Sequence, residues 1–191
     1  MFDFDLILEN KQIRLRPLQS SDFKVFAAIT KNQNTWKYFS CNLSNEKELE
    51  SWVNTAYLQT QSRTRLAFTI IYKPSNKILG SSSFGNFSFY DSRLEIGWTW
   101  LASEFHGKGI NRQVKFLMLE YCFEKLKLER VEFKTDVLNI SARKALIKIG
   151  AVEEGILRSH MVMTQNRRRD TIYYSILKSE WPGIKENLLE K

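Results

Sequence analysis

Apolar and polar positions alternate near the start of the chain and then change to helical spacing. Residues 13–17 read Ile-Arg-Leu-Arg-Pro, which is the period of a half-buried strand. Residues 20–22 offer oxygen atoms that can cap a helix, and the apolar side chains of Phe23, Phe26 and Ala27 recur at helical spacing. A second helical stripe after Ser44 comprises Leu49, Trp52, Val53, Ala56 and Tyr57.

The middle of the chain is typical of strands. Residues 66–72 and 78–84 are rich in apolar side chains, and Pro74 to Asn76 between them form a turn signal. In the next run, Leu94, Ile96, Trp98 and Trp100 alternate with Glu95, Gly97 and Thr99. This period of two predicts that the four apolar side chains share one face of a strand and that Glu95 points to the other.

The remaining elements alternate between helix and strand. An apolar stripe predicts a helix that ends near residues 125–127; it comprises Val114, Leu117, Met118, Tyr121 and Cys122. A strand is expected at 131–137, a short helix at 141–149 stopped by Gly150, and a hairpin that pairs 156–163 with 171–177. Interleaved helices and strands predict a mixed α/β or α+β fold, and the length favours a single domain over residues 1–191.

Composition and charge narrow the class of protein. The 191 residues are 43% hydrophobic and 26% charged, which is typical of a folded chain. Cys41 and Cys122 match neither a metal spacing nor a disulfide framework, so we expect a reducing, cytoplasmic location. No apolar run approaches the roughly 20 residues that cross a bilayer, and residues 1–10 carry no Lys or Arg, so neither a membrane role nor a signal peptide is expected. The formal charge of +8 favours an anionic partner.

The segment Glu104-Phe105-His106-Gly107-Lys108-Gly109-Ile110-Asn111 stands between a strand and an amphipathic helix. Glycines allow a tight turn and close approach of a ligand, and a helix start offers free N–H groups to a phosphate. A dinucleotide fingerprint would need a further glycine where Arg112 stands, and a P-loop would need Gly-Lys followed by Ser or Thr. An anion site is therefore favoured, and a turn without a ligand stays the alternative.

These glycines carry a resemblance to the GNAT superfamily of acetyltransferases, whose coenzyme A loop reads Q/R-x-x-G-x-G/A. Residues 104–109 match its glycines and depart at the first position, where Glu104 replaces Gln or Arg. The likeness covers Gln12 to Trp181 and resembles most the branch of the Rim-type ribosomal-protein N-terminal acetyltransferases. Four further stretches carry it: Ile13 to Leu18, Leu94 to Trp98, Asn139 to Gly150, and Arg169 to Thr171.

The resemblance implies a fold and a cofactor site. The fold would be a mixed, mostly antiparallel central sheet of about seven strands, splayed between the fourth and fifth, with helices on both faces. Acetyl-coenzyme A would be the co-substrate, its pantetheine arm in the splay beside the backbone of Trp100 and Leu101. The pyrophosphate would be bound by Gly107, Lys108, Gly109, Ile110, Asn111 and Arg112.

The resemblance also implies candidate catalytic residues. Glu95 aligns with a strand glutamate that serves as a base, often through water, in some relatives; a structural strand carboxylate is the alternative. Asn139 would lie near the pantetheine or the acceptor, or would cap the following helix. Relatives place a thiolate acid, serine or tyrosine, where this chain has Ala142 and Leu146, so no acid is assigned.

The acceptor follows from the resemblance only as a class. We expect an N-acetyltransferase that moves acetyl to a primary amine, on a protein N-terminus or a small molecule, by direct attack in a ternary complex. Trp36 and Tyr38 fall in the region that shapes the acceptor cleft in relatives, although core packing is the better interpretation for at least one of them. The two histidines show no ligand partners, so no metal is expected.

Two other functions and the question of partners stay open on sequence grounds. The missing acids allow a non-catalytic coenzyme A-binding regulatory module, and the basic charge allows an RNA- or ribosome-binding protein. For the enzyme we expect no nucleic-acid partner except through a ribosomal substrate. Dimers are common among relatives, so a homodimer is compatible with the resemblance.

Overall fold

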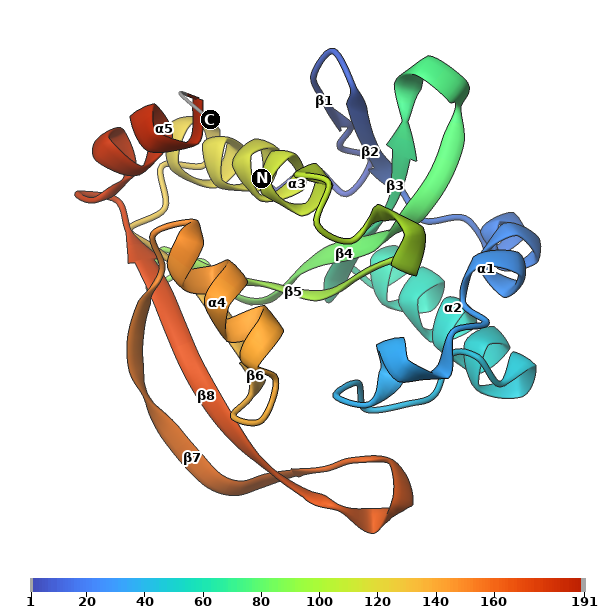
Figure 1. The fold of residues 1–191 in the computed structure, drawn as a ribbon. Coiled ribbons are helices and arrows are strands. Elements are labelled where there is room, and N and C mark those ends of the chain that lie inside the picture. Colours follow the sequence, from blue (N-terminus) through green and yellow to red (C-terminus); the bar gives the residue numbers. More distant parts are fainter. Residues whose placement is uncertain (1, 190–191) are drawn as a thin grey trace.

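A computed structural model describes residues 2–189, apart from the side chain of residue 165, and its core is one eight-stranded sheet. The strands lie in the order β1-β2-β3-β4-β5-β6-β8-β7 and all pair antiparallel except β5 and β6 (Figure 1). Their bounds are β1 Leu8–Glu9, β2 Ile13–Pro17, β3 Arg65–Tyr72, β4 Lys77–Ser88, β5 Arg93–Leu101, β6 Arg130–Asp136, β7 Val152–Val162 and β8 Arg168–Leu177.

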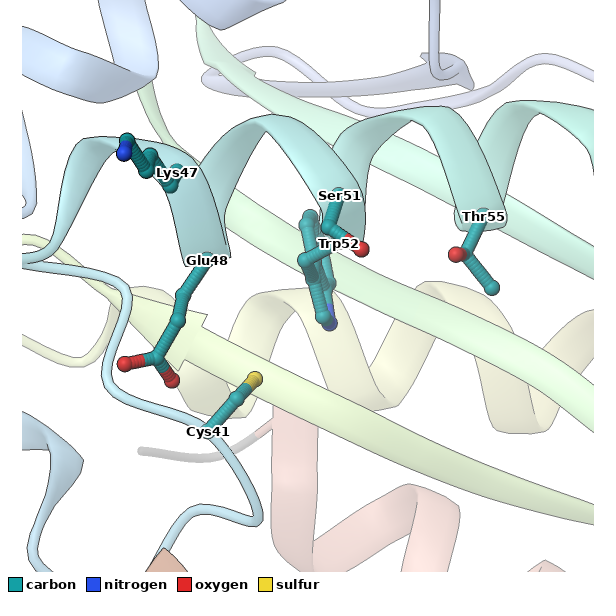
Figure 2. Close-up of a pocket in the computed structure, with 6 residues that line it drawn as sticks. All are labelled: Cys41, Lys47, Glu48, Ser51, Trp52 and Thr55. Carbon is teal, nitrogen blue, oxygen red and sulfur yellow. The ribbon is translucent and has the colours of Figure 1, made fainter.

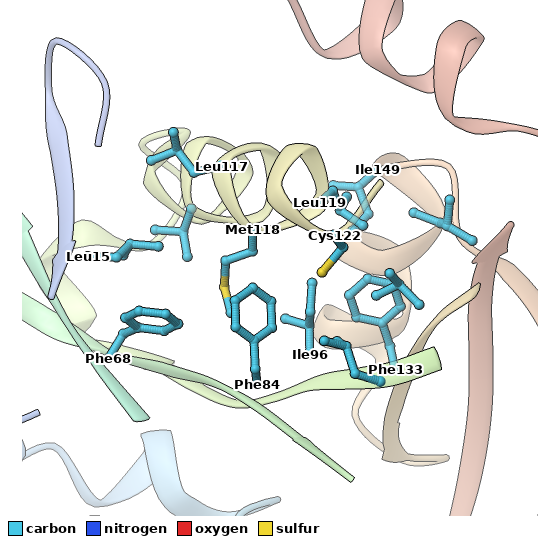
Figure 3. Packing of buried hydrophobic residues seen from close by; sticks show 14 of the residues in the cluster. Leu15, Phe68, Phe84, Ile96, Leu117, Met118, Leu119, Cys122, Phe133 and Ile149 are labelled. Atoms are coloured by element: carbon cyan, nitrogen blue, oxygen red, sulfur yellow. The ribbon is translucent and has the colours of Figure 1, made fainter. Parts of the chain in front are cut away.

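Helices cover both faces of this sheet. They are α1 Phe23–Ile29, α2 Glu46–Gln61, α3 Ile110–Glu120, α4 Ile140–Lys148 and α5 Trp181–Leu189. Two apolar clusters hold the layers together. The larger cluster packs α3 and α5 on the sheet; in Figure 3, Met118 of α3 and Cys122 of the helical turn that follows it point toward Phe84 of β4 and Phe133 of β6. The smaller cluster packs α1 and α2 on the opposite face. The expected mixed fold with helices on both faces is confirmed.

The sheet opens between β5 and β6. These two strands are parallel and pair over only three positions, from Arg93 opposite Arg130 to Glu95 opposite Glu132. Beyond Glu95, β5 stays bonded to β4 as far as Leu101, while β6 stays bonded to β8, so the two strands separate. The splay lies where the resemblance implied it, since β5 and β6 are the fourth and fifth strands once the two-residue β1 is left out.

The number of elements differs from the expectation at both ends of the chain. The sheet has eight strands instead of about seven because β1 spans only two residues, which is too short to show a period in the sequence. The tail adds α5, which packs Trp181 and Leu188 into the larger cluster. Among residues 2–189, no helix is both long enough and apolar enough to span a membrane.

The predicted alternation along β5 is wrong beyond Ile96. Trp98 has a φ of 50°, and the register with β4 shifts between Ser81 and Ser83. Such a bulge inserts one extra residue, which reverses the faces of all residues that follow it. Leu94 and Ile96 therefore pack under α3, whereas Trp100 lies in the cluster of α1 and α2.

The last two strands form the expected hairpin, longer than predicted at both ends. Strand β7 is exposed along nearly its whole length, and in Figure 1 the hairpin extends as a curved arm beyond the helices. On β8, the alternate residues Ile172, Tyr174 and Ile176 are buried in the larger cluster. The hairpin is thus anchored by β8, whose opposite face also buries Arg169, Thr171 and Ser175.

Candidate active site

The glycine segment forms a loop that leads from β5 into α3. Gly107 and Gly109 have φ of 74° and 75°, in the left-handed region that side chains other than glycine rarely adopt. Gly109 is the N-cap of α3, and the first bond of the helix runs from Gln113 N to the Gly109 carbonyl at 3.2 Å. The preceding N–H groups, of Ile110, Asn111 and Arg112, have no intrahelical acceptor and point out of the helix start.

This loop is open enough to approach an anion closely. A Cβ added at Gly107 or Gly109 would meet no atom within 4 Å, so no part of the protein covers the turn. Lys108 is exposed, with its ammonium 5.6 Å from the Phe105 ring centre, and Arg112 is half-buried. Free N–H groups, a helix dipole and two cations fit the diphosphate of a nucleotide cofactor.

Glu104 takes a different role from the Gln or Arg that relatives carry at this position. Its carboxylate pairs with Lys77 of β4 at 2.6 Å, and both side chains are about half exposed. The pair braces the loop against the start of β4. His106 also braces it, because its Nε2 lies 2.9 Å from the Leu101 carbonyl.

Glu95 lies at the last paired position before the splay. Its side chain is 4% exposed on the face opposite α3. Asn86 Nδ2 donates to Oε2 at 2.6 Å, and Lys134 Nζ lies 2.8 Å from the same oxygen. A Cβ at Gly97 would stand 2.7 Å from Oε1, so the glycine leaves room for this carboxylate. The geometry supplies a fixed carboxylate with one oxygen engaged by a cation and an amide.

Comparison with known proteins assigns the family. Residues 12–152, more than half of the chain, match the family described as "Acetyltransferase (GNAT) domain". The chain belongs to the GNAT superfamily of acetyltransferases.

Relatives of this GNAT chain match over most of their lengths. "Putative ribosomal N-acetyltransferase YdaF" of Bacillus subtilis (strain 168) is 32% identical over 181 residues, which cover 92% of this chain and 97% of YdaF. "Uncharacterized N-acetyltransferase p20" of Bacillus licheniformis is 26% identical, with 92% and 98% covered. The crystal structure of a GCN5-related N-acetyltransferase from Brucella melitensis superposes with a TM-score of 0.89 at 26% identity, covering 97% and 85%. The similarity to YdaF supports the Rim-type branch.

Among the residues that the GNAT resemblance singled out, Asn139 is the N-cap of α4. Its Oδ1 accepts a hydrogen bond from Ala142 N at 3.1 Å, and the side chain is half-buried. The capping interpretation is confirmed, and a further role toward the cofactor or acceptor stays a prediction. Ala142 and Leu146 cannot serve as acids in register with this asparagine, because neither carries an ionisable group.

The aromatic residues on this side of the sheet divide between core and surface. Trp36 is 3% exposed, donates its indole N–H to the Thr30 carbonyl at 2.8 Å, and packs on Trp100. Of the two residues expected near the acceptor cleft, Trp36 is therefore the one that packs in the core. Tyr38 is half-buried, with Lys37 Nζ 5.4 Å from its ring centre, and it remains the candidate for contact with an acceptor.

A shallow pocket of about 340 Å³ lies beside the first half of α2 (Figure 2), and its lining residue Trp52 packs on Trp100 in the same cluster as Trp36. Its lining is Cys41, Lys47, Glu48, Ser51, Trp52 and Thr55. Burial, with the Glu48 carboxylate nearby, raises the pKa of the Cys41 thiol to about 11, so this cysteine is not a ready nucleophile. Neither Glu95 nor the glycine loop lines this pocket.

Sequence reasoning missed three buried cations near the splay. Arg65 on β3 is flanked by the rings of Trp98 and Trp52, at 4.5 and 5.4 Å from their centres. Lys115 on α3 is bonded to Thr99 Oγ1 at 2.6 Å, and Arg169 on β8 is 7% exposed. The only signal was Lys115, a charge between the apolar positions Val114 and Leu117 of a helix.

Within residues 2–189, no group of His, Cys, Asp or Glu side chains is arranged to hold a metal ion. The two histidines have separate environments. His106 contacts the Leu101 carbonyl, and His160 Nδ1 lies 3.0 Å from Thr171 Oγ1 on the hairpin.

Proposed function

We propose that this protein transfers the acetyl group of acetyl-coenzyme A to a primary amine by direct attack in a ternary complex. One observation carries the proposal: β5 and β6 part directly after Glu95, and β5 then runs into the glycine loop at the start of α3. Residues 96–101 consequently have no strand partner on the β6 side. An extended ligand can pair with this free edge while its phosphates reach the helix start.

The cofactor would be held by backbone groups. The loop from Gly107 to Arg112 would bind the diphosphate, with charge from Lys108 and Arg112, and the backbone of Trp100 and Leu101 would bind the pantetheine. When bound, acetyl-coenzyme A supplies a thioester whose carbonyl carbon is open to attack by a neutral amine.

Glu95 would accept the proton that the amine loses. Both of its polar contacts, from Asn86 and Lys134, are to Oε2. Among the described residues Oε1 accepts no hydrogen bond, so it is the oxygen that would take a proton from the acceptor, directly or through water. Asn139, at the start of α4 on the other side of the splay, would help to position the pantetheine or acceptor.

An α-amine is the acceptor that costs the least free energy to deprotonate. With a pKa of about 8, an α-amine gives up its proton at pH 7 at a cost of about 1.4 kcal/mol, against about 4.6 kcal/mol for a lysine. The relative YdaF is described as a "Putative ribosomal N-acetyltransferase". An acceptor of that kind would be the N-terminus of a protein. A small-molecule α-amine fits the same chemistry.

The test is release of free coenzyme A thiol with a panel of primary amines, comparing wild type with Glu95→Gln. We expect acetylation by the wild type and a loss of kcat of about a hundredfold or more in Glu95→Gln. The matched control is Glu132→Gln, which replaces the carboxylate paired beside Glu95 on β6 and should keep most of the activity.

Two outcomes would contradict the proposal. If the folded protein binds acetyl-coenzyme A but acetylates no amine, it is a non-catalytic coenzyme A-binding module. If it does not respond to acetyl-coenzyme A and binds RNA with a steep dependence on salt, it is a basic RNA- or ribosome-binding protein.

A further inference from the structure

The face of the sheet opposite α3 gathers charged residues around the splay. Glu95 on β5, Lys134 and Asp136 on β6, Arg169 on β8 and Arg65 on β3 all occupy positions opposite to those of the larger apolar cluster. All five side chains are buried or nearly so, and β5 lies between β3 and β8 in the sheet. Charged groups of both signs are thus held on one side of the splay.

The two carboxylates of this group already have cationic partners. Glu95 Oε2 lies 2.8 Å from Lys134 Nζ, and Asp136 pairs with Arg167 in the turn between β7 and β8. Over residues 2–189, neither Arg65 nor Arg169 has a carboxylate within ion-pair distance. The two guanidinium groups are an excess of positive charge on this face.

Both arginines are also short of hydrogen-bond partners. Arg65 is 5% exposed and Arg169 is 7% exposed. Arg65 donates from Nε to Ser83 Oγ at 2.9 Å, but its Nη2 is buried without an acceptor among the described residues. Nε of Arg169 is also buried, and it forms no hydrogen bond with the described part of the chain.

These groups remain charged at neutral pH. Burial lowers the pKa of both guanidinium groups, to about 10 for Arg65, while the charge of Glu95 opposes the shift in each case. Asp136 also raises the pKa of Arg169, and Arg167 lowers it. A buried cation without a counter-charge destabilises a fold, so its presence beside a reaction site indicates that a ligand supplies the anion.

The cofactor does not supply this anion. Its phosphates would be held at Gly107 to Arg112, at the start of α3 on the opposite face, and the pantetheine and acetyl groups near the splay carry no charge. The acceptor is the remaining component of the ternary complex. We propose that the acceptor amine carries a carboxylate and that Arg169 binds it.

This inference rests on the proposed function and names the substrate class. The carboxylate can come from two sources: the α-carboxylate of an amino acid, or an acidic side chain close to the N-terminus of a peptide. Both place an anion beside an α-amine, and guanidinium groups bind carboxylates with two parallel hydrogen bonds. The amine would then lie toward Glu95, whose charge acts on Arg169.

The experiment compares matched acceptors with the full-length protein and acetyl-coenzyme A. Each amino acid is paired with its α-amide, and each peptide that has Asp at its second position with the same peptide carrying Asn. We expect kcat/KM to be at least about tenfold higher for the carboxylate member of the preferred pairs. Preference among amino acids or among peptides identifies the source.

Variants test the arginine directly. Arg169→Met should raise KM for the carboxylate acceptor about tenfold or more and remove the preference for the carboxylate member of each pair. It should not lower the melting temperature, because the lost charge was unpaired; a structural arginine would lower it. Arg158→Met, which replaces an exposed arginine on β7, is the control and should match the wild type in both readouts.

The outcomes separate this inference from the proposed function. Acetylation of acid and amide members at equal rates overturns the carboxylate inference and leaves the acetyltransferase proposal standing. A fall in melting temperature of several degrees in Arg169→Met, with the carboxylate preference intact, also overturns it. If no amine of any kind is acetylated, the proposed function fails and the inference fails with it.

Discussion

The two faces of β5 meet very different surroundings. Under α3, Leu94 and Ile96 join a cluster of aliphatic and aromatic side chains that continues through β4, β6 and β8. On the opposite face, Glu95 is buried between a lysine and an asparagine, and Trp98 stacks on Arg65. The apolar face tolerates almost no polar atoms, whereas the other face holds charges that need partners. We infer that the first supplies stability and the second supplies chemistry.

The largest expected effect is a loss of stability on the apolar face. Phe133→Ala removes a ring that is 2% exposed in the centre of the larger cluster, so it should lower the free energy of unfolding by about 3–5 kcal/mol. Tyr90→Ala is the control, because Tyr90 is 99% exposed and should change stability by about 0.5 kcal/mol or less. Denaturant unfolding measures both. Equal losses of unfolding free energy in the two variants would contradict the assignment of stability to the apolar face.

The second effect lies on the charged face, under α1. Arg16 donates two hydrogen bonds, at 2.8 and 2.6 Å, to Asp22, which is 3% exposed and also accepts one from Thr69. Arg16→Gln should lower the free energy of unfolding at pH 7 by about 3 kcal/mol, the lower end for breaking a buried pair. The control is Arg14→Gln, whose partner Glu9 is exposed, and it should unfold like the wild type.

The pH dependence of this pair has a definite sign. Burial alone would raise the pKa of Asp22, but hydrogen bonds from Arg16, Thr69 and the Gln19 backbone outweigh burial and lower it below 3.8. A depressed folded pKa contributes stability above the unfolded value, which is lost as pH falls. The difference between wild type and Arg16→Gln should therefore shrink below about pH 4. A difference that is constant down to pH 2 would contradict the pairing.

The smallest effect, per unit of pH, concerns the exception on the apolar face. Burial lowers the pKa of Lys115 to about 7, against a small opposing effect of Glu95. The unfolded lysine therefore binds a proton that the folded one releases, and stability should rise with pH between about 7 and 10 by up to about 1.4 kcal/mol per unit. Lys115→Met should flatten this slope in denaturant unfolding at several pH values; Lys125→Met, at an exposed position, should not.

Much of the fold could be predicted from periodicity because its elements are long and amphipathic. The stripe of α3 and the strand before the glycines place the loop where the structure has it. The two-residue β1 carries no period, and the bulge at Trp98 reverses a pattern that looked regular. Both failures are local geometry that pairing with a neighbouring strand decides.

The site was predictable only where a local motif exists. The positive φ of Gly107 and Gly109 agrees with the glycine motif. The burial of Arg65 and Arg169 could not be predicted, because it depends on how other elements pack against these strands, such as Trp52 of α2 and Trp98 of β5 against Arg65. The roles assigned to Glu95, Asn139 and Tyr38 remain predictions, of which the Glu95→Gln comparison tests the first.

The measurement that tests the account most directly is a thermal-shift titration with acetyl-coenzyme A. It compares wild type, a Gly107→Glu, Gly109→Glu variant, and Gly183→Glu, whose added carboxylate lies on α5. A ligand at a hundred times its Kd stabilises the native state by about 2.7 kcal/mol, so the melting temperature of wild type and Gly183→Glu should rise by several degrees. The loop variant should show no rise. If millimolar acetyl-coenzyme A shifts none of the folded proteins, or shifts all three equally, the loop is not the cofactor site and the proposed function is contradicted.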